Sequence, residues 1–230
     1  MKEFIGQSVF FGVFITLITY ELGTWIRKKT KLAICNPMLI SIIAVILFLL
    51  TFKIDYTVYY EGAKYISYLL TPATVALAVP LYEQFSKLKE NALAIVAGLV
   101  AGVLTSLCSI FVMCKLAGMS HELYVTLLPK SITTAIGMGI SEELGGVVTI
   151  TIAVIVITGI IGNVFAEAVC RLFHITDPVA KGIGIGSASH ALGTAKAMEL
   201  GEVEGAMSSL SIAVAGILTV VGASIFANFM

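Results

Sequence analysis

The sequence predicts an all-α membrane protein with about seven or eight transmembrane or re-entrant helices, several of them broken. Hydrophobic residues make up 58% of its 230 residues and charged residues only 12%, whereas about a quarter of the residues in soluble domains are charged. The formal net charge is zero and no basic stretch is long enough to follow a phosphate backbone, which argues against nucleic-acid binding. We therefore expect a single integral domain over residues 1–230, embedded in the lipid bilayer.

Five stretches are apolar throughout and are expected to cross the membrane as continuous helices of about 20 residues. They cover residues 4–26, 32–52, 91–116, 147–170 and 206–229. The first is long enough to remain as a span, and no small-residue cleavage site precedes a soluble domain, so nothing here resembles a removable signal peptide.

Three further stretches are apolar but contain proline or clustered glycine, which predicts discontinuous or re-entrant helices. A proline inside a helix costs about 3 kcal/mol, because it removes a hydrogen bond and clashes with the preceding turn. Irregular backbone is tolerated at membrane depth only where it is buried in protein or lines a watery cavity. The expected breaks are Pro72 and Pro80 in residues 65–85, Pro129 in residues 124–143, and Gly186 and Gly193 in residues 179–200.

The loop charges indicate an orientation, because cytoplasmic loops are enriched in lysine and arginine. The densest basic cluster, residues 27–31, is therefore expected inside and the N-terminus outside. If residues 124–143 enter and leave on one face, the basic loop 171–181 is also cytoplasmic and the chain crosses seven times. If they cross, there are eight spans and that loop faces outward. We prefer the re-entrant arrangement.

A weak internal repeat accompanies this topology. Residues 32–116 and 147–229 each contain a span, a broken span and a second span, and in the re-entrant topology the two sets run in opposite directions. Inverted repeats whose broken helices meet near the midplane are a recurring transporter plan. The expected organisation is an N-terminal span (1–31), a first repeat-like half (32–116), and a second half that carries the polar motifs (124–230).

Lys130 is the first candidate site residue, because it lies in an apolar stretch and is followed by Ser131, Thr133 and Thr134. A lysine near the bilayer centre costs about 2.5–3.5 kcal/mol, so we expect it to have a partner or a cavity. An ammonium group beside hydroxyl and amide donors suits a carboxylate. The alternative is that Lys130 lies at the interface and extends its ammonium group to water.

His190 is the second candidate, within a segment rich in serine, glycine and threonine. If a helix resumes near Ser189, then Ser187, His190 and Thr194 share one face. The start of that helix would offer unpaired N–H groups to an anion. His190 could donate to the anion or relay a proton, since imidazole titrates near physiological pH. The alternative is a structural histidine that is hydrogen-bonded between helices.

Three charged residues after this segment, Lys196, Glu202 and Glu204, could couple transport to a proton or cation, although a solvated rim would also account for the glutamates. Motifs of metalloproteases and serine hydrolases are absent, and no histidine or cysteine cluster has zinc-ligand spacing. We therefore expect no enzyme activity, no catalytic residue, no cofactor and no metal ion.

Several motifs resemble the LrgB/CidB family, in the right order and over essentially the whole chain. They are Thr71-Pro-Ala-Thr74-Val-Ala-Leu-Ala-Val-Pro80-Leu-Tyr82, Leu-Leu-Pro-Lys-Ser-Ile-Thr-Thr at 127–134, Asp-Pro-Val-Ala-Lys-Gly at 177–182, Ala-Ser-His-Ala-Leu-Gly-Thr-Ala-Lys-Ala at 188–197, and Gly-Glu-Val-Glu-Gly-Ala at 201–206. The chain departs from the family pattern at Thr71 and Ala135, where glycine and proline are expected, and the second departure loosens the break after Thr134.

The resemblance implies a multi-pass protein of the bacterial inner membrane that often works beside a small, holin-like LrgA/CidA partner. The family has been described as antiholin-like, controlling murein hydrolase export and lysis. Its relatives also include a plastid glycolate/glycerate carrier and bacterial pyruvate transport systems.

The residues favour a secondary transporter or facilitator of small carboxylates such as pyruvate or glycolate. In this hypothesis the Lys130 and His190 segments meet near mid-depth, and Thr71 and Thr74 contribute from residues 65–85. So small a carrier is expected to form a homodimer or to pair with its partner. The alternative is an antiholin-like regulator of holin pores that acts through helix contacts, for example the Gly98–Gly102 face, and does not need a buried lysine or histidine.

Overall fold

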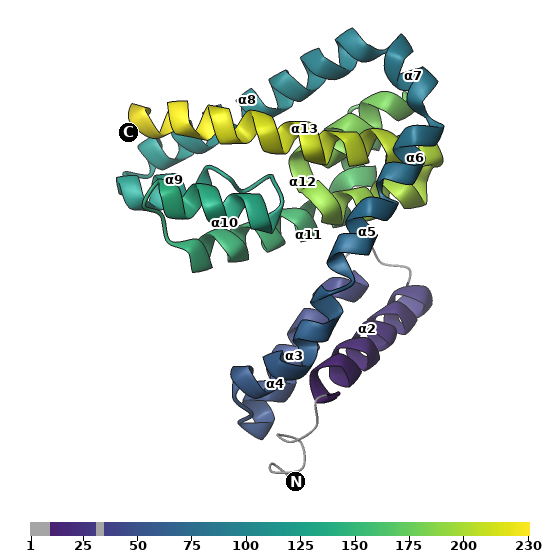
Figure 1. Ribbon diagram of the computed structural model, residues 1–230, viewed down its shortest axis with the longest axis vertical. Coiled ribbons are helices and arrows are strands. Elements are labelled where there is room, and N and C mark those ends of the chain that lie inside the picture. The colour runs from purple at the N-terminus through teal and green to yellow at the C-terminus, as the bar shows by residue number, and fades with distance from the viewer. Residues whose placement is uncertain (1–9, 31–34) are drawn as a thin grey trace. The chain divides into compact units, whose positions relative to one another are not determined.

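The computed structural model describes residues 10–30 and 35–230, except for the side chain of Thr74. Within these residues every regular element is a helix, which confirms the all-α class (Figure 1). The chain divides into two compact units, Met1–Ala76 and Leu77–Met230, and each is described by itself.

The first unit contains the helices α2 (Phe11–Thr30), α3 (Pro37–Phe52), α4 (Tyr56–Ser67) and α5 (Leu70–Ala76). Asn36 begins α3, because its side chain accepts hydrogen bonds from the first backbone N–H groups of that helix. Hydroxyl contacts join α2 to its neighbours: Thr19 Oγ1 lies 2.8 Å from Ser41 Oγ in α3, where both are buried, and Thr16 Oγ1 lies 2.8 Å from the Tyr59 hydroxyl in α4. The expected spans 4–26 and 32–52 thus fall on α2 and α3, while residues 1–9 and 31–34, including Lys31, lie outside the described residues.

Short helices follow one another between residues 56 and 90: α4, α5, α6 (Ala78–Glu83) and α7 (Phe85–Glu90). Pro72 and Pro80 lie in the first turns of α5 and α6, and the interruptions come just before them, at residues 68–69 and at Leu77. Proline fits the first turn of a helix because the backbone N–H it lacks would have no partner there.

The second unit continues with α8 (Ala92–Leu116), α9 (His121–Leu127), α10 (Thr134–Glu143), α11 (Val148–Leu172), α12 (Pro178–Leu200) and α13 (Glu202–Phe226), and ends in a 3₁₀ turn at Ala227–Phe229. Among the described residues, four segments are long and apolar enough to cross a membrane: Tyr56–Glu83, Ala92–Leu116, Val148–Leu172 and Glu202–Phe229. The last three coincide with the expected spans 91–116, 147–170 and 206–229. The helix α3 has only 16 residues, and the expected total of seven or eight spans is not reached on this criterion.

Two long helices, α8 and α13, run in the same direction. Near their starts, Ile95 and Leu99 belong to one buried cluster with Met207, and near their ends the rings of Phe111 and Phe229 lie 6.1 Å apart. We call the end of this unit where α8 and α13 begin end A, and the end where they finish end B.

The helices α9 and α10 form a hairpin that begins and ends at end B (Figure 1). Tyr124 in α9 donates a hydrogen bond to the carbonyl of Phe226 at the end of α13, at 2.8 Å. Thr151 in the first turn of α11 joins the two arms, because its hydroxyl lies 2.9 Å from the Thr126 carbonyl and 2.7 Å from Ser141 Oγ. The non-helical residues 128–133 make up the tip. We call residues 121–143 the first hairpin.

The helix α12 is also a hairpin, and it begins and ends at end A. Its first arm runs parallel to α13, since Gly182 packs on Glu204 and Gly186 packs on Ser208. Its second arm runs back, since Thr194 contacts Ser208 and Met198 packs on Gly205. We call residues 178–200 the second hairpin.

The chain reverses at His190, the one described residue of α12 with non-helical torsions (φ 43°, ψ −140°). The breaks expected at Gly186 and Gly193 are therefore misplaced. Both glycines are helical and instead allow close packing: a Cβ atom on Gly186 would lie 2.5 Å from the Ser208 carbonyl oxygen, and one on Gly193 would lie 2.6 Å from Ser189 Cβ. A glycine costs a helix only about 1 kcal/mol, so a packing requirement can retain it there without breaking the helix.

Candidate functional site

Ile155 in α11 contacts both hairpins. The Ile155 carbonyl accepts a hydrogen bond from His190 Nε2 at 3.0 Å. The Ile155 side chain lies against Gly137 of the first hairpin so closely that a Cβ atom there would collide with it. One residue of α11 thus contacts both hairpins close to their tips.

The middle of α8 also contacts both hairpins. Ser106 Oγ lies 3.1 Å from Ser131 Oγ in the first hairpin. Gly102, one turn earlier and about 6 Å away along the helix, faces the second hairpin, where a Cβ atom would lie 3.1 Å from Ser187 Oγ. Ser131 of the first hairpin and Ser187 of the second therefore both lie beside the middle of α8.

Lys130 is half-buried at the tip of the first hairpin, and its ammonium group donates a hydrogen bond to Ser131 Oγ at 2.9 Å. In the part of the chain that the structure describes, no carboxylate forms an ion pair with it. Four residues later α10 begins, and Thr133, at its N-cap position, makes no side-chain capping hydrogen bond. The first N–H groups of α10 and the positive end of its dipole are therefore available to a ligand, a few residues after Lys130 in the chain. Thr133 and Thr134 are only partly buried.

His190 is only 5% exposed and forms the tip of the second hairpin. A carbonyl can only accept, so the contact with Ile155 means that Nε2 carries a hydrogen. No hydrogen bond to Nδ1 occurs among the described residues. A positive φ at a non-glycine residue costs about 1–3 kcal/mol, and such strain persists only where the surrounding structure enforces it. Strained residues cluster at functional sites, which makes this tip a candidate on backbone geometry as well as on chemistry.

The hydroxyl groups of the second hairpin are mostly engaged inside the protein. Ser187 donates to the Ile183 carbonyl at 2.7 Å. Thr194 donates to the His190 carbonyl at 3.0 Å and lies 2.7 Å from Ser208 Oγ, so Ser208 donates to Thr194. Ser187 and Thr194 could therefore offer a ligand acceptor capacity only, and in this conformation they fix the hairpin tip.

The residues suggested for coupling lie towards end A, not at the tips. Lys196 is six residues, or about 9 Å along a helix, from His190, and it pairs with Glu167 at 3.4 Å and Glu199 at 3.2 Å. Glu204 is buried at the base of the second hairpin, with its carboxylate 3.9 Å from the ammonium of Lys181.

Several other expected site residues are not at the hairpin tips of this conformation. Glu202 is exposed in the first turn of α13, and Ser189 is buried against Gly162 of α11. Thr71 is exposed on α5 in the first unit, and Thr74 lies on the same helix with its side chain outside the described residues. Their part in a site stays a prediction. Among the described residues no cluster of histidine, cysteine, aspartate or glutamate could hold a metal ion.

The sequence analysis did not identify the residues of α11 that contact the second hairpin. Asn163 in α11 donates to the Leu192 carbonyl at 2.6 Å, just after the chain reversal. Gly159 leaves room for the His190 ring, since a Cβ atom there would lie 2.7 Å from Cε1. An asparagine inside an apolar span was the available signal, because polar groups at membrane depth need a partner.

Comparison with known proteins supports the motif resemblance. The LrgB-like family matches residues 16–229. Two curated relatives from Bacillus cereus and Bacillus anthracis, both called antiholin-like protein LrgB, are each 36% identical over 225 residues, which is 97% of this chain and 98% of theirs. No solved structure matches. The apolar helices and these matches together show a membrane protein that belongs to the LrgB-like family.

Proposed function

We propose that this protein is a secondary transporter or facilitator of small carboxylates, with its binding site between the two hairpin tips. The observation that carries the proposal is Lys130, a half-buried cation whose hydrogen-bond partner is the neutral Ser131. Leaving a buried charge unpaired is costly, and an anionic substrate would supply the missing charge. The start of α10 would add backbone N–H donors to the same oxygen atoms.

The site suits a small molecule. The two hairpins pack closely against Ile155, so a substrate of a few heavy atoms, such as pyruvate or glycolate, is favoured over a larger acid. His190 Nδ1 would face the substrate as a second polar group, either donating to it or exchanging a proton with it.

The two hairpins suggest how access would alternate. Residues 121–143 and 178–200 enter from opposite ends, and each is followed by a helix of 25 residues, α11 or α13. We propose that these two hairpin-plus-helix pairs are the inverted repeat, with boundaries that differ from those expected between residues 32–116 and 147–229. In this mechanism each hairpin covers the site from its own end and opens in turn.

End A is proposed to face the cytoplasm of a bacterial inner membrane. Lys87 and Lys89 in α7, Arg171 and Lys181 lie at this end, whereas Glu142 and Glu143 lie at end B. Short cytoplasmic loops carry an excess of lysine and arginine.

The second candidate function is regulation of holin-type pores, and the name of the curated relatives favours it. It would require contacts with a small membrane partner of the LrgA/CidA type, or between copies of this chain. The Gly98–Gly102 face, a natural candidate for such contacts, packs against Ile183 and Ser187 of the second hairpin. Contacts with a partner or a second copy would therefore have to use other apolar surfaces.

The test is uptake of labelled pyruvate and glycolate into liposomes that contain the purified protein, with and without a pH gradient. We expect uptake above that of protein-free liposomes. Lys130→Met should lower it about 10- to 150-fold, because a hydrogen bond to a charged group contributes about 1.5–3 kcal/mol. The matched control is Lys115→Met, which removes an exposed lysine at the end of α8.

Two results would contradict the transporter. One is the absence of uptake for every small carboxylate, also when the small partner is supplied. The other is full activity of Lys130→Met. If Lys130→Met and His190→Gly nevertheless retain control of lysis in cells, the regulator is the better description.

A further inference from the structure

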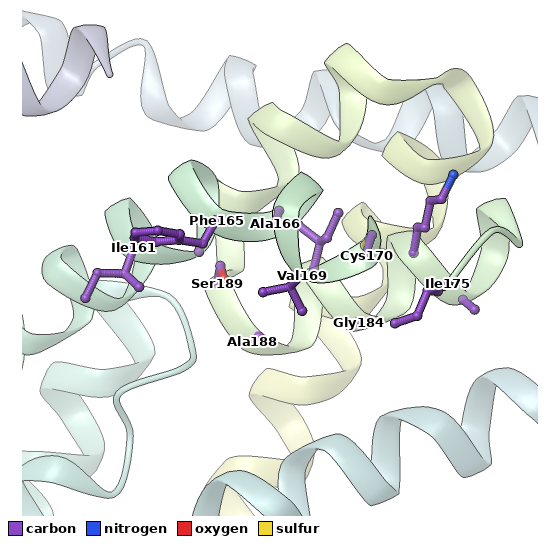
Figure 2. Close-up of a pocket in the computed structure, with 13 residues that line it drawn as sticks. Ile161, Phe165, Ala166, Val169, Cys170, Ile175, Gly184, Ala188 and Ser189 are labelled. Carbon is purple, nitrogen blue, oxygen red and sulfur yellow. The ribbon is translucent and has the colours of Figure 1, made fainter. Parts of the chain in front are cut away.

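A groove of about 270 Å³ runs along α11 and the first arm of the second hairpin. Figure 2 shows its apolar wall, with Ile161, Phe165 and Val169 on α11. The groove extends along α12 from Lys181 near end A to Ser189 beside the tip. From Lys181 to Ser189 the helix rises by about 12 Å, close to the depth of about 15 Å that one leaflet contributes to the hydrocarbon core.

A second hollow, of about 320 Å³, continues the groove at end A. The two share Cys170, Ile175 and Lys181, so they form one continuous surface. The second hollow carries more polar groups than the first, because Glu167, Arg171 and His174 line it. The whole surface is therefore amphipathic, with a mouth that contains charged groups and an apolar length.

Lys181 and Arg171, at the mouth of the groove, have N–H groups that are free to bind a ligand. The ammonium of Lys181 lies 3.9 Å from the Glu204 carboxylate, too far for a hydrogen bond, and no hydrogen bond to it occurs among the described residues. Arg171 gives one N–H to Glu167 at 2.5 Å, and its side chain is 79% exposed. A guanidinium has five N–H donors. The Glu167 carboxylate lies beside both Arg171 and Lys196, and it accepts only one of the Arg171 N–H groups.

We propose that this surface binds one anionic phospholipid, with its phosphate at Lys181, Arg171 and His174 and an acyl chain along the groove. The phosphate needs several donors and positive charge, and basic hollows between membrane helices on the cytoplasmic side suit such headgroups. An apolar groove of one-leaflet depth suits a chain that is covalently joined to that headgroup. The deep end of the groove is Ser189, next to His190, so the lipid supports the hairpin that carries the tip.

Gly184 provides a specific test, because it lines the groove and a Cβ atom there would meet nothing within 4 Å. Gly184→Trp places a large ring at the groove from an unobstructed Cβ position, and Gly184→Leu fills the groove partly. Gly139 in α10 is a matched control, since it is also helical and exposed with nothing within 4 Å. Arg171→Gln tests the headgroup end.

The measurement is native mass spectrometry of the purified full-length protein, titrated with phosphatidylglycerol or with phosphatidylcholine of the same chain length. The unmodified protein should bind phosphatidylglycerol more tightly than phosphatidylcholine. Gly184→Trp should weaken phosphatidylglycerol binding at least about ten-fold, and Gly184→Leu by less, while Gly139→Trp leaves it unchanged. Arg171→Gln should weaken it about five-fold, which corresponds to about 1 kcal/mol for one cation at an anionic headgroup.

Equal binding of the two lipids, or unchanged phosphatidylglycerol binding in both Gly184 variants, would overturn the proposal. A change in the mass of the oligomer in Gly184→Trp, without loss of lipid, would also overturn it and assign the groove to a second copy of the chain. Lipid binding needs no substrate, so the result is independent of the transport assay.

Discussion

Replacing Gly162 with alanine tests whether close packing between α11 and the second hairpin holds the hairpin in place. A Cβ atom on residue 162 would lie closer to Ser189 Cβ and Oγ than real side chains approach one another. Because α11 is a continuous helix on one side and the first arm of α12 is a helix on the other, neither side can make room by moving a single side chain. The arm itself has to move.

The size of the effect follows from two opposing terms. Overpacking of this kind costs about 1–3 kcal/mol, whereas alanine in place of glycine inside a helix contributes up to about 1 kcal/mol. Because Ser189 Cβ is one of the colliding atoms and cannot rotate away, the cost lies in the upper part of that range, about 2–3 kcal/mol, and the net destabilisation is about 1–2 kcal/mol. In a chain of this length each kcal/mol lowers the melting temperature by about 2–4 °C, so we expect a decrease of about 2–8 °C. Uptake should fall by about 100-fold, because displacement of a binding group by about 1 Å has effects of that order.

The assay is thermal unfolding of the purified protein in detergent, followed by carboxylate uptake in liposomes. Gly139→Ala is the control, and it should melt at or slightly above the temperature of the unmodified protein, since nothing lies within 4 Å of that position. Ser189→Gly removes both colliding atoms, so the double variant Gly162→Ala/Ser189→Gly should recover stability that Gly162→Ala loses. A Gly162→Ala protein that melts normally, or a second substitution that merely adds its own cost, would refute the packing argument.

Three further substitutions have defined outcomes. His190→Gly should be more stable than His190→Ala by about 1–2 kcal/mol in thermal unfolding, because φ is 43° at this position and glycine adopts such torsions without strain; equal stability would contradict the assigned backbone. Tyr124→Phe should cost about 1 kcal/mol by leaving the Phe226 carbonyl without its donor, yet transport should be retained, because the contact lies at end B. Thr194→Val should cost about 1–3 kcal/mol and reduce uptake, since Ser208 loses its buried partner at the second hairpin; unchanged unfolding would show that this hydroxyl pair is not needed.

The sequence was sufficient for the helical class and for the helices that match 91–116, 147–170 and 206–229, because an uninterrupted run of about 20 apolar residues is typical of a membrane-spanning helix. It was not sufficient for residues 178–200. This segment has 23 residues, which is the length of one crossing and also of two half-crossings joined by a tight reversal. Only contacts with α13 and α11 distinguish the two, and these depend on residues far away in the chain.

The position of the break in α12 was missed for a related reason. Glycine both interrupts helices and allows them to pack closely, so Gly186 and Gly193 were compatible with either role, and in the structure they have the second. The residue with the unusual torsion is His190, and a histidine does not by itself require a positive φ. Its surroundings impose it.

The sequence could indicate that the Lys130 and Ser187 segments face the interior of the protein, because both combine hydroxyl residues with helix-breaking ones in otherwise apolar stretches. Their common contact with α8, through Ser106 and Gly102, could not. A single serine and a single glycine inside a long apolar helix carry too little information to show which way that helix faces.

The entry of the hairpins from opposite ends has a consequence for leakage. In a carrier of this plan, a water molecule that passed beside one tip would still meet the other, so the two tips would act as two barriers in series. Damage confined to one hairpin would leave ion gradients intact. Damage to both would open a continuous aqueous conduit, and paired lesions should therefore be far more toxic to the cell than either lesion alone.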